Sequence, residues 1–390
     1  MMVTGVCFPE GFAAAGIAAG LKASGGKDLA LVVNEGILPA AAAVFTSNRV
    51  EAEPVKFSRA QMRNGVVTHI LLNSGNANAC TGEQGRKDVK ACVNELSLAA
   101  GVDQAKIAVC STGVIGEYLD TAAITRAIPA LVSGLDVSGA TSAASAIMTT
   151  DTVPKEVQIE VDGWRVGGMA KGAGMLAPAL ATMLCVITTD AVIDNEALDS
   201  ALRHAVQVSF NRLDTDGCMS TNDTVIVLAS GESGITPDEA TFATALEQAC
   251  TKLAKMLRDD AEGAEHFVDI TVSGASSEAA AVEVARAVSR SNLVKTAIFG
   301  NDPNWGRILS QIGTVPSWVA PFDVGKVNVS INGVMICKNG SVGDPKESLD
   351  LAASQEVKIE IDLGAGNSSA TVYTTDLTHA YVHENSAYTS

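Results

Sequence analysis

The sequence predicts an α/β protein. Apolar runs typical of strands occur at 29–35, 41–46, 66–73 and 107–110, and helix start and stop signals lie between and after them. Asp162-Gly163 separates Glu156–Val161 from Trp164–Gly168, a pattern typical of a β-hairpin. With 390 residues, of which 47% are hydrophobic, the chain can bury a large core and form two or three domains.

In the first half, a helix is predicted after Thr81. Thr81-x-x-Gln84 has the pattern of a capping box, and the helix should stop near Gly101. Ser111-Thr112-Gly113 directly follows a predicted strand, so a tight turn there can present a backbone N–H and a hydroxyl together. The predicted hairpin then leads into the segment Lys171–Leu184, which places Thr182 on or beside a sheet.

In the second half, Asp194 is expected to cap a helix to about Phe210, and 224–230 is a predicted strand. Thr236-Pro237-Asp238-Glu239 combines a capping box with Pro at the first helical position, opening a long helix to Gly263. Glu262 would then lie at the helix C-terminus, where its charge is unfavourable without a nearby cation. Two interpretations of Glu262 stay open: a solvated carboxylate, or a ligand for an ammonium group.

The C-terminal part is predicted to be a smaller α+β domain with antiparallel strands. Its expected elements are a strand at 267–274, a helix at 276–291, strands within 325–338 around an Asn332-Gly333 turn, and strands at 356–363 and 369–376.

Composition and charge exclude several classes of function. The net charge of −17 disfavours nucleic acid and anionic membranes as partners. The N-terminus lacks a basic segment followed by an apolar one, so we expect a cytoplasmic protein. Eight scattered cysteines form no CxxC pair, and His379 and His383 lack the intervening Glu of a metalloprotease helix. We therefore expect neither a metal nor a cofactor.

The segment Lys171–Leu184 is the strongest candidate for chemistry. It is an apolar run broken by Gly and Pro, and Thr182 in it follows the small residue Ala181. A threonine there can attack the preceding carbonyl and cut the chain. Its new α-amine, with a pKa of about 8, can then act as base for its own hydroxyl.

Three simpler interpretations of this segment exist. The two glycines, the proline and the threonines argue against a membrane helix, although residues 172–189 carry no charge. A phosphate loop requires Gly-Lys followed by Ser or Thr, whereas the order here is Lys-Gly. An ordinary pair of buried strands stays open on these residues alone.

Nine blocks along nearly the whole chain resemble the ornithine acetyltransferases, also called glutamate N-acetyltransferases, of arginine biosynthesis. They are KGAGM…ATML (171–184), ITTDA (187–191), NSGNANAC (73–80), STGVIG (111–116), IMTTDT (147–152), DGCMSTNDT (216–224), DAEG (260–263), DPNWGR (302–307) and ENSAY (384–388). Their order and the length of the chain also match that family.

The resemblance implies the αββα-type core of the self-processing aminopeptidases and amidases, with a smaller C-terminal domain. Self-cleavage at Ala181-Thr182 would give an α chain of residues 1–181. The β chain would hold the rest of the core at 182–280 and the smaller domain at 281–390, with its tail returning to the active site. Two α and two β chains are expected to form a heterotetramer.

The resemblance also assigns roles. The enzyme transfers acetyl from N2-acetyl-L-ornithine to L-glutamate by a ping-pong mechanism through acetyl-Thr182, and acetyl-CoA as a second donor is left open. The Thr112 hydroxyl and Gly113 N–H form the oxyanion hole. The substrate-binding residues are Thr149, Lys171, Thr182, Glu262, Asn385 and Ser390. Lys171 suits a carboxylate and Glu262 an ammonium.

Two departures from the family pattern occur. Ala179-Leu180 replaces a polar residue and Met of many members, and Ser390 replaces a terminal Thr. Tyr381, Val382, Ala387 and Tyr388 are expected to anchor the tail by apolar contacts. A self-processing aminopeptidase or amidase that hydrolyses its acyl-enzyme is the alternative enzyme, and a ligand-binding protein without activity is the alternative outside enzymes.

Overall fold

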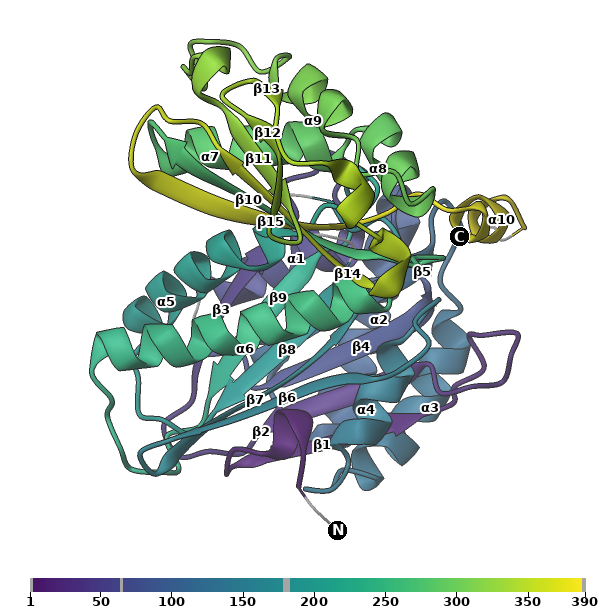
Figure 1. The fold of residues 1–390 in the computed structure, drawn as a ribbon. Coiled ribbons are helices and arrows are strands. Elements are labelled where there is room, and N and C mark those ends of the chain that lie inside the picture. Colours follow the sequence, from purple (N-terminus) through teal and green to yellow (C-terminus); the bar gives the residue numbers. More distant parts are fainter. Residues whose placement is uncertain (1–2, 64–65, 178–182, 388–390) are drawn as a thin grey trace.

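Two sheets packed face to face form the larger part of the molecule (Figure 1). The computed structural model describes residues 3–63, 66–177 and 183–387. The first sheet has the order β1 (Phe12–Ile17), β2 (Leu29–Asn34), β4 (His69–Asn76) and β5 (Ile107–Val114). The second has the order β3 (Ala40–Phe45), β9 (Thr224–Ala229), β8 (Leu184–Thr189), β7 (Trp164–Lys171) and β6 (Lys155–Val161).

Helices cover both outer faces of this pair of sheets. α2 (Gly82–Ala100) and α3 (Thr121–Ser133) pack on the first sheet, and α5 (Asn195–Val208) and α6 (Glu239–Asp259) pack on the second. α1 (Glu53–Met62) contacts β5 and β3, and α4 (Ala140–Ile147) packs against β1 and β2. The order of layers is α, β, β, α, which confirms the predicted fold class.

Alternation along the strands explains this layering. In β2, Leu29, Leu31 and Val33 join the core shared with α2 and α3, whereas Ala30 and Val32 join the core between the two sheets. Because both faces of the strand are buried, its sequence is a continuous apolar run rather than an alternating one.

Several predicted turns and caps are confirmed. Asp162 and Gly163 have φ of +45° and +90°, and they join β6 to β7 as a hairpin. The Asp194 carboxylate accepts a hydrogen bond from the Ala197 N–H at 2.9 Å. Gly101 ends α2 in the left-handed conformation, with φ of +65°.

Both predicted capping boxes are wrong. The Thr81 hydroxyl donates to Asn78 Oδ1 at 2.6 Å, and Gln84 donates to Asp88 at 2.8 Å, so neither caps α2. The cap of α6 is Asp238, which accepts from the Thr241 N–H at 2.9 Å, and Pro237 lies before the helix. α6 ends at Asp259, three residues before Glu262.

A third sheet forms the smaller domain, with its own core (Figure 1). Its order is β13 (Ser341–Val342), β12 (Val334–Lys338), β11 (Asn328–Ile331), β14 (Glu356–Asp362), β10 (Phe267–Ala275) and β15 (Ser368–Thr375). Its helices are α7 (Glu278–Ser289), α8 (Asn292–Phe299) and α9 (Trp305–Ile312). Short 3₁₀ helices occur along the chain at Gly5–Cys7, Gln104–Lys106, Phe210–Arg212, Val324–Lys326, Lys346–Ser348 and Leu351–Ala353.

Two expectations about this domain need correction. The sheet is mixed rather than antiparallel, because β10 and β14 are parallel. A boundary at 280/281 would separate β10 from β14 and β15, its partners in the sheet. We therefore propose that the smaller domain begins between Gly263 and Phe267.

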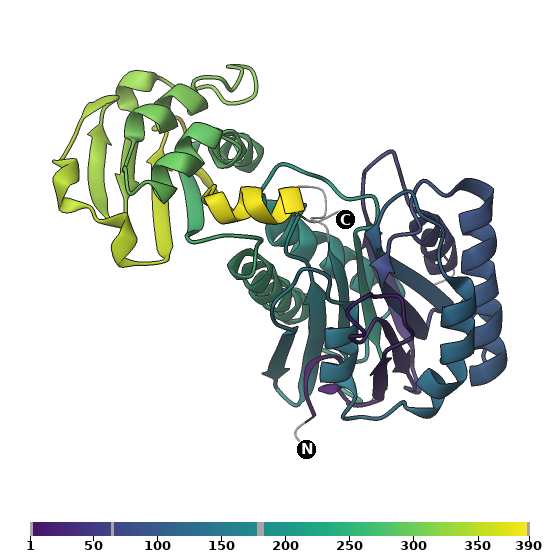
Figure 2. The same cartoon turned by 90° about the vertical axis from the view of Figure 1, so that its right-hand side faces the viewer.

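The C-terminal helix α10 (His379–Ala387) lies between the smaller domain and the core (Figure 2). The Thr378 hydroxyl just before it donates to the Gly263 carbonyl at 2.5 Å. Tyr381 is half-buried, whereas Val382 and Ala387 are exposed, so the predicted apolar anchorage is wrong for these two residues. Tyr388 lies outside the described residues.

Candidate functional site

Six of the predicted site residues line one cavity of about 70 Å³, although they come from five separate segments. They are Thr112 and Gly113 of β5, Thr149 after α4, Lys171 at the end of β7, Glu262 after α6 and Asn385 of α10. The remaining lining residues are Ala77, Ile115, Thr150, Gly174, Met175, Ser220, Thr221 and Asn222. Ala181, Thr182 and Ser390 lie outside the described residues, so their roles stay predictions.

The predicted tight turn at Ser111-Thr112-Gly113 is wrong, because these residues lie within strand β5. Gly113 nevertheless has to be glycine for two reasons. Its φ is +129°, a region that side chains rarely adopt. A β-carbon there would also overlap the backbone of Gly75 and Asn76 on the neighbouring strand β4. The Thr-Gly pair thus lies where two parallel strands end side by side.

Lys171 of the second sheet contacts Thr112 of the first sheet. Its Nζ donates a hydrogen bond to Thr112 Oγ1 at 3.2 Å, and the residue is 2% exposed. Burial lowers the pKa of the Lys171 ammonium, and the Asp151 carboxylate is the first of the charges that oppose this shift. The cavity therefore combines a buried cation with a hydroxyl.

Glu262 supplies a carboxylate to the same cavity. Its carboxylate accepts from the Thr150 hydroxyl at 2.8 Å and from Asn385 Nδ2 at 3.0 Å. Its backbone N–H donates to the Ala173 carbonyl at 3.0 Å. A β-carbon on Gly174 would touch the Glu262 carboxylate. These contacts hold an anion beside the loop that follows Lys171.

A buried ion cluster of Asp151, Lys155 and Asp260 connects the segments around the cavity. Lys155 Nζ lies 2.6 Å from a carboxylate oxygen of both acids, and its side chain is 1% exposed. Asp151 also accepts from the Thr149 N–H at 2.9 Å and from the Gly172 N–H at 2.6 Å. Burial would raise the pKa of Asp151, but Lys171 and Lys155 hold it below its usual value.

Asp223 lies next to the predicted cleavage site. Its Oδ1 accepts a hydrogen bond at 3.0 Å from the N–H of Met183, the residue that follows Thr182. Oδ2 is buried and has no hydrogen-bond partner among the described residues. Burial raises the pKa of this carboxyl well above its usual value. Sequence reasoning did not single out Asp223, although the residue is part of the DGCMSTNDT block.

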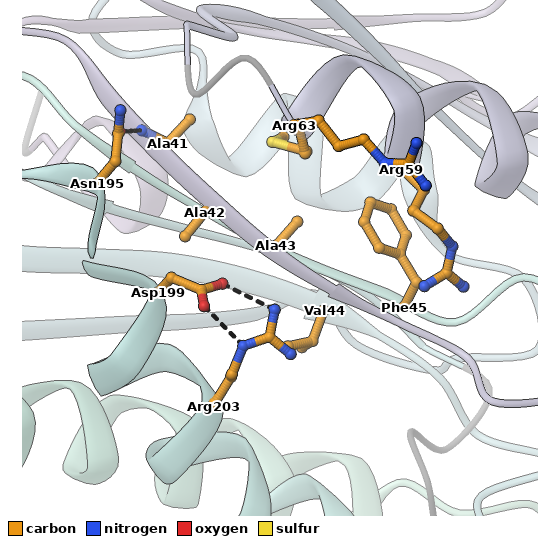
Figure 3. Close-up of a pocket in the computed structure, with 11 residues that line it drawn as sticks. Ala41, Ala42, Ala43, Val44, Phe45, Arg59, Arg63, Asn195, Asp199 and Arg203 are labelled. Carbon is orange, nitrogen blue, oxygen red and sulfur yellow. Dashed lines mark hydrogen bonds and ion pairs between the residues drawn. The ribbon is translucent and has the colours of Figure 1, made fainter. Parts of the chain in front are cut away.

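A larger pocket, of about 450 Å³, lies along the edge strand β3 between α1 and α5 (Figure 3). Three arginines line it, but two of them are already paired. Arg203 bonds Asp199 at 2.7 and 3.0 Å, and Arg59 bonds Glu51 at 2.6 Å. This pocket contains none of the predicted site residues, so its size does not make it the candidate active site.

The described ranges 3–63, 66–177 and 183–387 contain neither a group of metal ligands nor a helix able to cross a membrane. There, no three His, Cys, Asp or Glu side chains are grouped as metal ligands would be. No helix in this part of the chain is both long and apolar enough to cross a membrane.

Comparison with known proteins identifies the family. The profile of the ArgJ family matches residues 13–390. The arginine biosynthesis bifunctional protein ArgJ of Streptomyces coelicolor is 53% identical over 381 residues, which cover 98% of each chain. That of Bifidobacterium longum is 53% identical over 392 residues, covering 99% of this chain and all of the relative.

A solved structure is also similar. The crystal structure of an ornithine acetyltransferase from Mycobacterium tuberculosis, in complex with ornithine, is 45% identical. It covers 47% of this chain and 98% of its own, with a TM-score of 0.45. The family profile and the two full-length relatives together show that this chain belongs to the ArgJ family.

Proposed function

We propose that this chain is a glutamate N-acetyltransferase of arginine biosynthesis that moves acetyl from N2-acetyl-L-ornithine to L-glutamate. The chain belongs to the ArgJ family, and one structural observation supports the proposal further. Thr112, Gly113, Lys171, Glu262 and Asn385 come from distant segments and line a single cavity. That cavity adjoins the segment that leads to Thr182.

The first step is self-cleavage at Ala181-Thr182. The Thr182 hydroxyl oxygen adds to the Ala181 carbonyl carbon, the C–N bond breaks, and the proton of the hydroxyl passes to the nitrogen. Water then hydrolyses the ester, which leaves a carboxylate on Ala181 and a free α-amine on Thr182. Asp223 supports this step because it holds the N–H of Met183 at 3.0 Å.

In the first half of turnover, Thr182 Oγ adds to the acetyl carbonyl of acetylornithine while its α-amine accepts the hydroxyl proton. The tetrahedral oxyanion is placed at the Thr112 hydroxyl and the Gly113 N–H. A single oxyanion donor of this kind contributes about 3–4 kcal/mol. The C–N bond then breaks, and the α-ammonium returns the proton to the departing amine of ornithine.

In the second half, the amine of glutamate attacks the acetyl-threonine ester. A second oxyanion forms at the same donors, the C–O bond to Thr182 breaks, and the proton lost by the amine returns to Thr182 Oγ. N-acetylglutamate leaves, and the enzyme is restored. No external cofactor takes part in either half.

The charges in the cavity suit these substrates. Glu262 is placed for the side-chain ammonium that ornithine has and glutamate lacks. Lys171 is placed for the carboxylate that both substrates carry on the reacting unit. Each group opposes the charge it would bind, and such charge-assisted hydrogen bonds are stronger than neutral ones.

The processed enzyme is further proposed to be a cytoplasmic heterotetramer of two α chains, residues 1–181, and two β chains, residues 182–390. The resemblance to the family supports this assembly. Native mass spectrometry beside a denaturing gel measures both the subunit sizes and their number.

The product formed from acetylornithine tests the proposed function. With glutamate present, ornithine and N-acetylglutamate should form in equal amounts, because acetyl passes between the two amines. Release of free acetate in place of N-acetylglutamate would instead make the chain a self-processing hydrolase. A parallel reaction with acetyl-CoA and glutamate, without acetylornithine, measures whether acetyl-CoA is also a donor.

Removing residues 385–390 is expected to raise KM about tenfold or more while the fold stays intact, because Asn385 hydrogen-bonds Glu262 at 3.0 Å. Asn385→Ala should give a smaller increase in the same direction. Ser386→Ala is the matched control, since that hydroxyl bonds only the His383 carbonyl of its own helix among the described residues. An unchanged KM for both substrates in the truncated enzyme would show that the tail has no part in binding.

A further inference from the structure

The hydrogen bond between Lys171 and Thr112 has a fixed direction when the lysine is protonated. An ammonium has three donors and no acceptor, so Lys171 Nζ must donate and Thr112 Oγ1 must accept. A hydroxyl that accepts one bond still has its own proton to donate. Among the described residues, Lys171 is the single hydrogen-bond partner of the Thr112 hydroxyl. The hydroxyl proton of Thr112 is therefore left to be donated to another acceptor.

We propose that Lys171 orients the Thr112 hydroxyl as a proton donor and so helps to stabilise the oxyanion, whether or not it also binds a substrate carboxylate. The inference rests on the proposed function, because it assigns a role in that reaction. Lys171 acts through Thr112 and is therefore a positioning residue. A chain of two bonds, from ammonium to hydroxyl to oxyanion, is also polarised along its length, which strengthens each bond.

The surroundings hold Lys171 in this role. Lys171 is the last residue of β7, and Thr112 is 4% exposed near the end of β5, so the bond joins the two sheets. The next residue, Gly172, donates its N–H to Asp151 at 2.6 Å. Because Asp151 is itself held by Lys155 at 2.6 Å, the backbone beside Lys171 is anchored on a buried ion pair.

Self-cleavage separates this role from substrate binding. The precursor cuts itself without any substrate, so a lysine that only binds a substrate carboxylate has no part in that step. The attack of Thr182 on Ala181 nevertheless forms an oxyanion. A lysine that orients an oxyanion donor must therefore affect the rate of self-cleavage.

The test measures precursor disappearance by pulse–chase in cell-free translation, with denaturing gels, for the full 390-residue chain. Lys171→Met should slow self-cleavage about 10- to 100-fold, since losing a whole oxyanion donor costs about 10²–10³-fold. An unchanged cleavage rate in Lys171→Met would overturn the proposal. If circular dichroism shows the Met variant unfolded, Lys171→Gln replaces it, with the same direction expected.

A double-mutant cycle on the same rate tests whether Lys171 acts through Thr112. Thr112→Val removes the hydroxyl and keeps the shape. In that background, Lys171→Met should slow cleavage less than threefold further, because no hydroxyl remains to orient. If the two effects multiply in full, Lys171 acts independently of Thr112 and the proposal is wrong.

Lys295→Met is the matched control. Lys295 is 4% exposed, and its Nζ also donates to a threonine hydroxyl, that of Thr374, at 3.2 Å. This variant loses a buried ammonium and the same kind of bond elsewhere, and it should cleave at the wild-type rate. Equal slowing by Lys295→Met and Lys171→Met would assign the effect to the loss of any buried lysine. Failure of the wild-type chain to cleave would instead count against the proposed function.

Discussion

Replacing Thr182 with Ala is expected to leave the chain in one piece and to abolish acetyl transfer. The loss should be on the order of 10⁶-fold, to background, as expected when a covalent nucleophile is removed. No other hydroxyl gains a terminal amine in the uncut chain, so nothing replaces the lost nucleophile and base. A denaturing gel and the acetyl-transfer assay measure the two effects separately.

Thr182→Ser is the informative comparison for this variant. Serine keeps the hydroxyl but loses the methyl group that restricts χ1. It should therefore still cleave, with an altered turnover rate. Transfer at the wild-type rate by Thr182→Ala would rule out the threonine mechanism.

Glu262→Gln should discriminate between the two substrates. In ping-pong kinetics the kcat/KM of each substrate reports its own half-reaction. Loss of the charge should lower kcat/KM for acetylornithine about 10- to 100-fold, since a hydrogen bond to a charged group contributes about 1.5–3 kcal/mol. The value for glutamate, which has no side-chain ammonium, should change less than about threefold.

The control for this experiment is Glu265→Gln, at an exposed acid three residues further along the chain. It should leave both kcat/KM values unchanged. Equal losses for the two substrates in Glu262→Gln would mean that Glu262 supports the cavity rather than the ornithine ammonium. Glu262 already accepts bonds from Thr150 and Asn385, so that outcome has a clear structural origin.

Local signals predicted local structure well. The Asp162-Gly163 turn and the Asp194 cap depend on a few neighbouring residues, and both occur as predicted. The capping box at Thr81 failed because its hydroxyl bonds Asn78, which competes with the helix end for the same group. Capping patterns in sequence cannot exclude such a competitor.

The site could not be predicted from local patterns, because its residues meet through contacts between distant parts of the sequence. Lys155 and Asp260 are 105 residues apart, and Glu262 and Asn385 are 123 apart. Only the family resemblance predicted that Glu262 and Asn385 belong to the same site. Lys155 did carry a signal, since it shares one face of β6 with the buried residues Val157 and Ile159. A charged residue on an apolar face indicates a buried partner.

The mass of the fragment 182–390 tests most directly whether the enzyme forms an acetyl-Thr182 intermediate. After incubation with acetylornithine alone, this fragment should gain one acetyl group, about 42 Da, on Thr182. Addition of glutamate should remove the adduct and release N-acetylglutamate. A fragment that stays unmodified under turnover, together with intersecting double-reciprocal lines, would contradict the covalent ping-pong mechanism.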